Sequence, residues 1–158
     1  MSSLAIRRYE PRDYERVFEL HVLGLEQTGT HVDSWAYGRD LESPGALAAT
    51  YLGDRSDFLV GELDGVIVAM GALRPFDETR VEMKRVRVDP QHQRQGLGET
   101  IVVALEGRAR ELGASAIHLD TTAGQQPAIA MYRKLGYDEI GRGSLTRFDI
   151  VLMEKSLG

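Results

Sequence analysis

Apolar residues along the chain switch between the two-residue spacing of strands and the three-to-four-residue spacing of helices. Two apolar runs in the first half are separated by Asp64-Gly65, a dipeptide that favours a two-residue type I′ turn, so they predict a β-hairpin. Gly113 and Gly136 each follow an amphipathic stretch and predict helix C-termini. The pattern predicts strands over residues 4–8, 58–63, 66–73, 80–88, 117–121 and 148–153, helices over 13–25, 45–52, 97–112 and 127–135, and pairing of 137–141 with the last strand.

The order of these elements predicts a single domain over residues 1–158, built on a mixed sheet. The early strands are joined by a hairpin and should run antiparallel, whereas the later strand–helix–strand units favour parallel pairing. Helices are expected on both faces, because each face of such a sheet is apolar and must be covered. We therefore expect an α/β fold of the α+β kind, with a twisted and mostly antiparallel sheet.

Composition narrows the classes of function. Hydrophobic residues make up 42% of the 158 residues and the net charge is −5, which indicates a soluble globular protein and argues against a nucleic-acid partner. There is no cysteine, so disulfides, thiolate ligands and a cysteine nucleophile are excluded, and the four histidines show no metal-ligand spacing; no metal site is predicted. Without a signal peptide or a long apolar segment, we expect a cytoplasmic protein that does not bind membranes.

The strand at 80–88 is followed by a loop with two glycines, and the helix at 97–112 begins at the end of this loop. The first N–H groups of a helix lack internal partners and glycine lets the backbone approach a ligand, so Gly96 and Gly98 suit a phosphate or pyrophosphate. A P-loop is excluded because Gly98 is followed by Glu-Thr, and a dinucleotide fingerprint is excluded because Ile101 stands at its third glycine. A tight turn that merely caps the helix stays open on these residues alone.

The run Gln93-Arg-Gln-Gly-Leu-Gly98 matches the Gln/Arg-x-x-Gly-x-Gly/Ala signature of the GNAT superfamily of acetyl-CoA-dependent N-acetyltransferases. The preceding residues 82–90 resemble the family's fourth strand and its exit turn, and residues 120–137 resemble a later family motif, with Gln125 where Asn is usual. The resemblance covers most of the chain except residues 27–53 and 142–147. It implies an enzyme that moves an acetyl group from acetyl-CoA to a primary amine of a small molecule or peptide.

The resemblance also implies where acetyl-CoA binds. The parallel strands on either side of the helix at 97–112 should splay apart and hold the cofactor in the split, beyond their carboxyl ends. The backbone of Val86, Arg87 and Val88 would pair with the pantetheine arm, and the Val86 amide, freed by a bulge, would point at the thioester oxygen. Arg94 is either a phosphate ligand or a solvated side chain. The remaining cofactor-binding residues so implied are Gln93, Arg94, Gln95, Gly96, Leu97, Gly98, Glu99 and Gln125.

Tyr132 matches the general acid of the family. A phenol of pKa ~10 is a reasonable proton donor to a leaving thiolate of pKa ~8.5. The alternative is a core tyrosine on a helix that also carries Ile129 and Leu135.

Glu82 matches the residue that accepts the amine proton in many similar proteins, directly or through a water. Its even spacing from Lys84, Val86 and Val88 predicts that one face of the strand holds all four side chains. The alternative is an ion pair with Lys84, Arg80 or a neighbouring strand.

Two other functions stay open: transfer from another acyl-CoA, such as propionyl- or succinyl-CoA, and a CoA-binding sensor without turnover. The presence of Tyr132 favours catalysis, since a sensor would not need it. The resemblance also allows a homodimer, because many similar proteins are dimers. The acceptor amine is not determined by the residues that shape this pocket in similar proteins, which have mixed charge here: Glu26, His31, Asp33, Trp35, Tyr37, Arg142 and Arg147.

Overall fold

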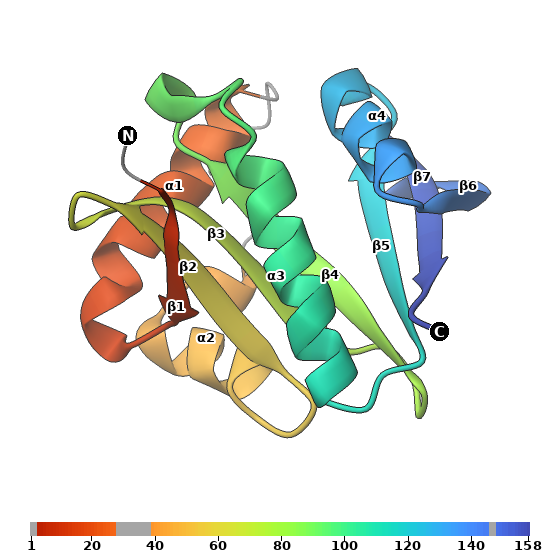
Figure 1. The fold of residues 1–158 in the computed structure, drawn as a ribbon, viewed down its shortest axis with the longest axis horizontal. Helices are drawn as coiled ribbons and strands as arrows, with labels where there is room; N and C mark the ends of the chain where they lie inside the picture. The colour runs from red at the N-terminus through yellow and green to blue at the C-terminus, as the bar shows by residue number, and fades with distance from the viewer. Residues whose placement is uncertain (1–2, 28–38, 146–147) are drawn as a thin grey trace.

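The computed structural model describes residues 3–27, 39–145 and 148–158, and within them seven strands form one sheet (Figure 1). The strand order across the sheet is β1-β2-β3-β4-β5-β7-β6. Every neighbouring pair is antiparallel except β4 and β5, which run parallel. The strands are β1 (Ala5–Arg8), β2 (Asp57–Leu63), β3 (Val66–Pro75), β4 (Arg80–Val88), β5 (Ala116–Thr122), β6 (Asp138–Leu145) and β7 (Phe148–Ser156).

Helices cover both faces of this sheet, as predicted (Figure 1). The two N-terminal helices pack on one face, and the two that follow β4 and β5 pack on the other. No helix among the described residues is long and apolar enough to cross a membrane. The helices are α1 (Tyr14–Gln27), α2 (Pro44–Tyr51), α3 (Leu97–Glu111) and α4 (Gln126–Lys134), with short 3-10 turns η1 (Pro11–Asp13), η3 (Arg39–Leu41) and η4 (Pro90–His92).

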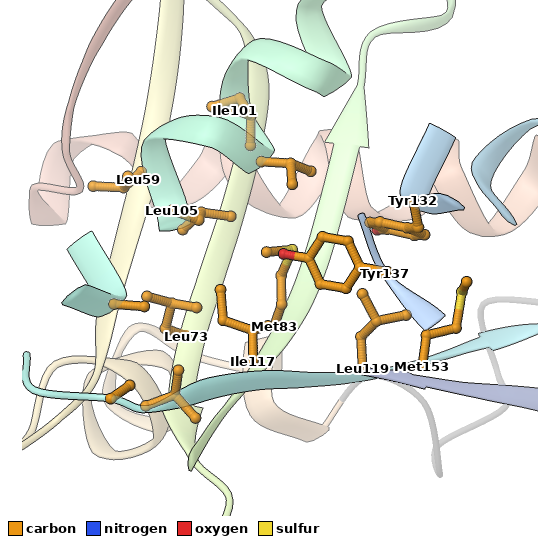
Figure 2. Packing of buried hydrophobic residues seen from close by; sticks show 14 of the residues in the cluster. Leu59, Leu73, Met83, Ile101, Leu105, Ile117, Leu119, Tyr132, Tyr137 and Met153 are labelled. Atoms are coloured by element: carbon orange, nitrogen blue, oxygen red, sulfur yellow. The ribbon is translucent and has the colours of Figure 1, made fainter. Parts of the chain in front are cut away.

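Two apolar cores follow from this arrangement. Leu59 and Leu73 of the hairpin face α3, whereas their neighbours Phe58 and Ala72 face α1 and α2. The strands are therefore apolar at consecutive positions rather than alternating, because neither face meets water. Figure 2 shows the α3 side, where helix side chains lie over the strands and Tyr132 and Tyr137 complete the core toward β5 and β7.

The turn residues behave as their types predict. Asp64 and Gly65 both have positive φ, at 52° and 81°, as a type I′ turn requires. Gly113 and Gly136 have φ values of 83° and 98° just beyond α3 and α4, which confirms both predicted helix ends. The predicted pairing of 137–141 with the last strand is also confirmed, since β6 pairs with β7 along its whole length.

The parallel pair is short. Only the first three residues of β4, Arg80 to Glu82, are in register with β5, where they face Ala116 to His118. Beyond this point the two strands separate (Figure 1). The splayed parallel pair expected from the sequence is therefore present, and it opens the sheet between α3 and α4.

Candidate active site

A cavity of about 410 Å³ lies where β4 and β5 separate. Its walls come from the second half of β4, the loop after it, the first turn of α3, the end of β5 and one side of α4. Among the residues predicted for the site, Gln95 and Glu82 do not line this cavity. Those that do are Val86, Arg87, Val88, Gln93, Arg94, Gly96, Leu97, Gly98, Glu99, Gln125 and Tyr132.

A β-bulge interrupts β4 beside the cavity. Arg87 pairs with Met70 and Lys84 pairs with Ala72, so the two residues between them on β4 oppose the single residue Gly71. Arg85 takes up the distortion with a φ of 60°. The bulge leaves Arg85 and Val86 without Cα register partners on β3, and the role of the Val86 amide at the thioester stays a prediction.

Gly71 is required opposite the bulge because α3 comes very close there. A Cβ on Gly71 would lie 2.6 Å from Leu105 Cδ1 and 3.0 Å from Ile101 Cγ2, both of which are side chains of α3. A larger residue would therefore force these side chains or the helix itself to move. The glycine thus holds the bulge and the helix that opens at the cavity in contact with each other.

The bulge also overturns one expectation about β4. Before the bulge, the odd-numbered residues Val81 and Met83 face α3. After the bulge, the even-numbered residues Val86 and Val88 face α3. Glu82 and Lys84 therefore lie on the opposite face from the two valines, and the prediction that one face holds all four was wrong. The physical reason is that one extra residue shifts a two-residue alternation by one position.

Glu82 is buried and has a partner on the neighbouring strand. Arg74 Nε of β3 donates to Glu82 Oε1 at 2.8 Å, and the carboxylate is 7% exposed. This is the ion pair that the sequence left open as the alternative to a catalytic role. The role of Glu82 as a base stays a prediction.

The start of α3 leaves backbone donors facing the cavity. The helix begins at Leu97, and its N-cap residue is Gly96, which has a φ of 77°. Because Gly96 has no side chain, it cannot accept hydrogen bonds from the first backbone N–H groups of the helix. Arg94 has a φ of 64°, so the loop before the helix is tightly wound. A Cβ on Gly98 would point between Met131 Sδ, at 3.4 Å, and Val88 Cγ2, at 3.7 Å. These features fit an anion held against a helix N-terminus.

Tyr132 lies on the cavity wall formed by α4. Its ring is 7% exposed and meets Tyr137 edge-on, with ring centroids 5.5 Å apart (Figure 2). Burial raises the pKa of Tyr132 to about 12, and the positive charge of Arg87 opposes the rise. Within the described part of the chain its hydroxyl has no hydrogen-bond partner, whereas the Tyr137 hydroxyl donates to Glu106 Oε2 at 2.9 Å. The Tyr132 hydroxyl is thus free for a ligand.

Two ion pairs at the cavity were not predicted. Arg85 makes a bidentate ion pair with Asp40 of η3, with N–O distances of 2.8 and 2.6 Å. Burial by itself would raise the pKa of Asp40, but the hydrogen bonds and the charge of Arg85 outweigh this effect and lower the pKa to about 2. Lys84 lies 3.9 Å from Asp120 at the end of β5. The Asp-Thr-Thr run that ends β5 was a usable signal for the second pair, because polar residues at a strand's carboxyl end often line a site.

Two histidines do not line this cavity, whereas His92 does. His21 is buried in α1 with 2% exposure, and His118 Nδ1 lies 3.0 Å from Glu154 Oε2. Across residues 3–27, 39–145 and 148–158, no three metal-ligating side chains form a group that could hold an ion. Of the residues expected around the acceptor, Arg142 pairs with Glu139 at the surface. His31, Asp33, Trp35, Tyr37 and Arg147 lie outside the described residues.

The comparison with protein families decides the assignment. A model described as the acetyltransferase (GNAT) family matches residues 12–137, which includes the stretch 27–53 that the sequence motifs left uncovered. The chain belongs to the GNAT family. Other members of this family are acetyltransferases, and the cavity between β4 and β5 is the candidate active site.

Individual GNAT relatives are similar over part of their length. Human N-acetyltransferase 8 is 32% identical over 102 residues, which cover 61% of this chain and 45% of the human protein. The IAA acetyltransferase of Azospirillum brasilense is 35% identical over 85 residues, covering 53% of this chain and 56% of that protein. The chain spans about half the length of these relatives.

Solved structures are similar over nearly the whole chain. A putative acyl-CoA N-acyltransferase from Klebsiella pneumoniae has a TM-score of 0.73 and 30% identity, with 98% of each chain covered. A GNAT acetyltransferase from Staphylococcus aureus has a TM-score of 0.85 at 18% identity, covering 99% of this chain and 100% of that one. The putative acetyltransferase yncA of Salmonella typhimurium, solved with its cofactor acetyl-CoA, has a TM-score of 0.78 at 22% identity, covering 99% of this chain and 95% of that one. The last two similarities concern the fold alone.

Proposed function

We propose that this GNAT protein transfers an acetyl group from acetyl-CoA to a primary amine of a small molecule or peptide by direct attack of the amine. The observation that carries the proposal is a single cavity that brings together the bulge in β4, the open start of α3 and the unpartnered hydroxyl of Tyr132. Each feature suits one need of acyl transfer: the start of α3 suits cofactor binding, the bulge suits stabilisation of the oxyanion, and the Tyr132 hydroxyl suits stabilisation of the leaving thiolate.

Cofactor binding is assigned to the loop and the strand on one side of the cavity. The pyrophosphate of acetyl-CoA would accept hydrogen bonds from the backbone amides at the start of α3, with Arg94 adding positive charge. The pantetheine arm would lie along Val86 and Val88 as an added strand in the split. The Val86 amide, at the bulge where the register with β3 is interrupted, would then donate to the thioester oxygen as it gains charge.

Tyr132 is assigned to the leaving thiolate. With a pKa near 12 the phenol keeps its proton across the neutral range, so the donor form is always present. Full transfer to a thiolate whose thiol has a pKa of ~8.5 is uphill by roughly 5 kcal/mol. Tyr132 therefore acts first as a hydrogen-bond donor to the departing sulfur, in the charge-assisted bond that a thiolate favours.

Glu82 is proposed as the group that accepts the amine proton, through a water rather than directly. It lies on the same face of β4 as the cavity residue Lys84 but does not itself line the cavity. Its ion pair with Arg74 supports a structural role instead. The pH dependence of a Glu82 variant separates the two roles.

The proposed function is tested by mixing the protein with acetyl-CoA and a panel of primary amines while free thiol and acetylated product are measured. We expect thiol release that depends on the amine, together with product that carries one acetyl group. Propionyl-CoA and succinyl-CoA in parallel reactions test the acyl preference, and acetyl-CoA should give the fastest turnover. Tight CoA binding without release above the protein-free rate would instead identify a sensor.

A further inference from the structure

The charged side chains of the cavity are not evenly paired. The described residues that line it include six with a formal charge, namely Lys84, Arg85, Arg87, Arg94, Glu99 and Asp120. Lys84 faces Asp120 and Arg85 is held by Asp40, while Glu99 pairs with Lys134 at 3.1 Å. Arg94 belongs to the loop assigned to the pyrophosphate. Arg87 is the remaining cation.

Arg87 lies where the burial of its positive charge is unfavourable. Its side chain runs between β4 and α1 directly against Gly24, where a Cβ would lie 2.4 Å from both Arg87 Cδ and Nε. Nε is enclosed and has no acceptor, and Nη1 reaches only the Val86 carbonyl at 3.4 Å. No described carboxylate lies within ion-pair distance of it. Burial, helped by the charge of Arg85, lowers the pKa of Arg87 to about 10, so the group is still a cation at neutral pH. The residue as a whole is half-buried, so the rest of the guanidinium is accessible, and a cation in this position without a described carboxylate partner suits an anionic ligand.

A second buried group without a hydrogen-bond partner lies on α1, the helix against which Arg87 packs. His21 is three residues before Gly24 on α1, and its buried Nδ1 has no hydrogen-bond partner. Burial and the charges of Arg85 and Arg87 lower the pKa of His21 to about 4, which leaves it neutral at pH 7. The contact between α1 and β4 thus holds two polar groups that the described residues do not satisfy.

We propose that Arg87 binds a carboxylate of the acceptor, so that the preferred acceptors are amines with a carboxylate close to the amino group, as in free amino acids. This inference rests on the proposed function. The planar guanidinium matches a carboxylate with two parallel hydrogen bonds. Arg87 and Tyr132 line the same cavity, so a carboxylate on Arg87 would place the neighbouring amine in the cavity assigned to the thioester.

The positive charge of Arg87 also selects among amines. A cation disfavours a nearby ammonium group, so an acceptor without an anionic group is repelled, and a bound amine loses its proton more easily. An amino acid brings its own anion and satisfies Arg87 before the amine reacts. A peptide N-terminus has no carboxylate next to its amine, so we expect peptides to be poor acceptors.

The test compares matched acceptors that differ only in the carboxylate: L-phenylalanine, L-phenylalaninamide and 2-phenylethylamine, with the same triplets built on leucine and methionine. In the wild-type protein we expect kcat/KM for the best amino acid to exceed that for its amide and its decarboxylated amine by about tenfold to a hundredfold, the range for a charge-assisted hydrogen-bonded pair. Arg87→Met should remove this preference by lowering kcat/KM for the acid far more than for the amide.

Two further variants keep the result interpretable. Gly24→Ala displaces the Arg87 side chain without removing its charge and should also reduce the preference. Lys84→Met removes a cation from the same strand and cavity, but one already near Asp120, and should leave the preference unchanged. CoA affinity and melting temperature are measured for each variant.

Equal use of acids, amides and amines by the wild type, or an unchanged preference in Arg87→Met, would overturn the inference while the proposed function stands. An absence of turnover with every amine tested would refute the proposed function, and the inference with it.

Discussion

Removing one hydroxyl from each of two touching tyrosines should separate chemistry from stability. Tyr132 and Tyr137 meet edge-on at 5.5 Å in the same core, yet their hydroxyls have opposite surroundings. The Tyr132 hydroxyl lies at the cavity without a hydrogen-bond partner among the described residues, whereas the Tyr137 hydroxyl is hydrogen-bonded to buried Glu106. Replacing either residue by Phe keeps the ring and its packing. We expect Tyr132→Phe to lose activity and Tyr137→Phe to lose stability.

The magnitudes follow from these contacts. A hydrogen bond to a charged group contributes about 1.5–3 kcal/mol, so Tyr137→Phe should lower the melting temperature by roughly 3–10 °C. Glu106 keeps Lys155, at 3.1 Å, as its second partner, which limits the loss. Tyr132→Phe breaks no protein hydrogen bond and should shift the melting temperature by less than about 2 °C. It should lower kcat by ~10²–10⁴, the usual range for removal of a general acid.

Three measurements on each variant distinguish a loss of activity from a loss of stability: thermal unfolding, calorimetric affinity for acetyl-CoA and turnover by thiol release. Tyr132→Phe should keep acetyl-CoA affinity within a few-fold of wild type, and Tyr137→Phe should retain most of its kcat below its melting temperature. Full activity in Tyr132→Phe would show that solvent protonates the thiolate. A large loss of stability in that variant would show that its hydroxyl has a structural partner, which the account denies.

Two other predictions concern pH. Glu82→Gln should lower kcat/KM and abolish its acidic limb; an unchanged pH profile would leave Glu82 with a purely structural role. His21 is surrounded by Arg85, Arg87 and Asp40, and its pKa is about 4 when folded against an ordinary 6.5, so its contribution to stability is present above pH 6.5 and lost as pH falls toward 4. Urea unfolding at pH 7 and pH 4.5 should show a loss of up to roughly 3 kcal/mol that is much smaller in His21→Leu, and an equal loss in both proteins would contradict this.

Most of the fold could be predicted because its signals are local. The Asp64-Gly65 turn and the glycines after α3 and α4 depend on backbone preferences of single residues. The bulge in β4 leaves only a weak trace, because no glycine or proline marks it and the apolar positions shift from Val81 and Met83 to Val86 and Val88 across the polar pair Lys84-Arg85. It depends on Gly71 of the opposite strand and on how closely α3 packs there. Without the bulge, the two faces of the strand could not be assigned correctly.

In the candidate site, too, only the part that is contiguous in sequence could be predicted. The loop around Gly96 and Gly98 and the start of α3 are contiguous in sequence, so a motif describes them. The pair of Arg85 with Asp40 joins residues far apart in the chain, and Asp40 lies in a stretch that carries no periodic pattern. Arg87 appeared in the sequence only as backbone that contacts the cofactor. That its guanidinium lacks a partner depends on the packing of α1 against β4, which only the structure shows.

The central claim is that the cavity at the start of α3 binds CoA, and calorimetric titration of Gly98→Asp with CoA tests it most directly. The new carboxylate would enter the cavity beside Met131 and Val88, where the pyrophosphate is assigned, while an acidic residue in the first turn suits the helix dipole, so the protein should still fold. Gly107→Asp, on the same helix with open space around its Cβ, is the matched control. We predict wild-type CoA affinity in Gly107→Asp and no measurable binding in folded Gly98→Asp; near-normal affinity in folded Gly98→Asp would contradict the account.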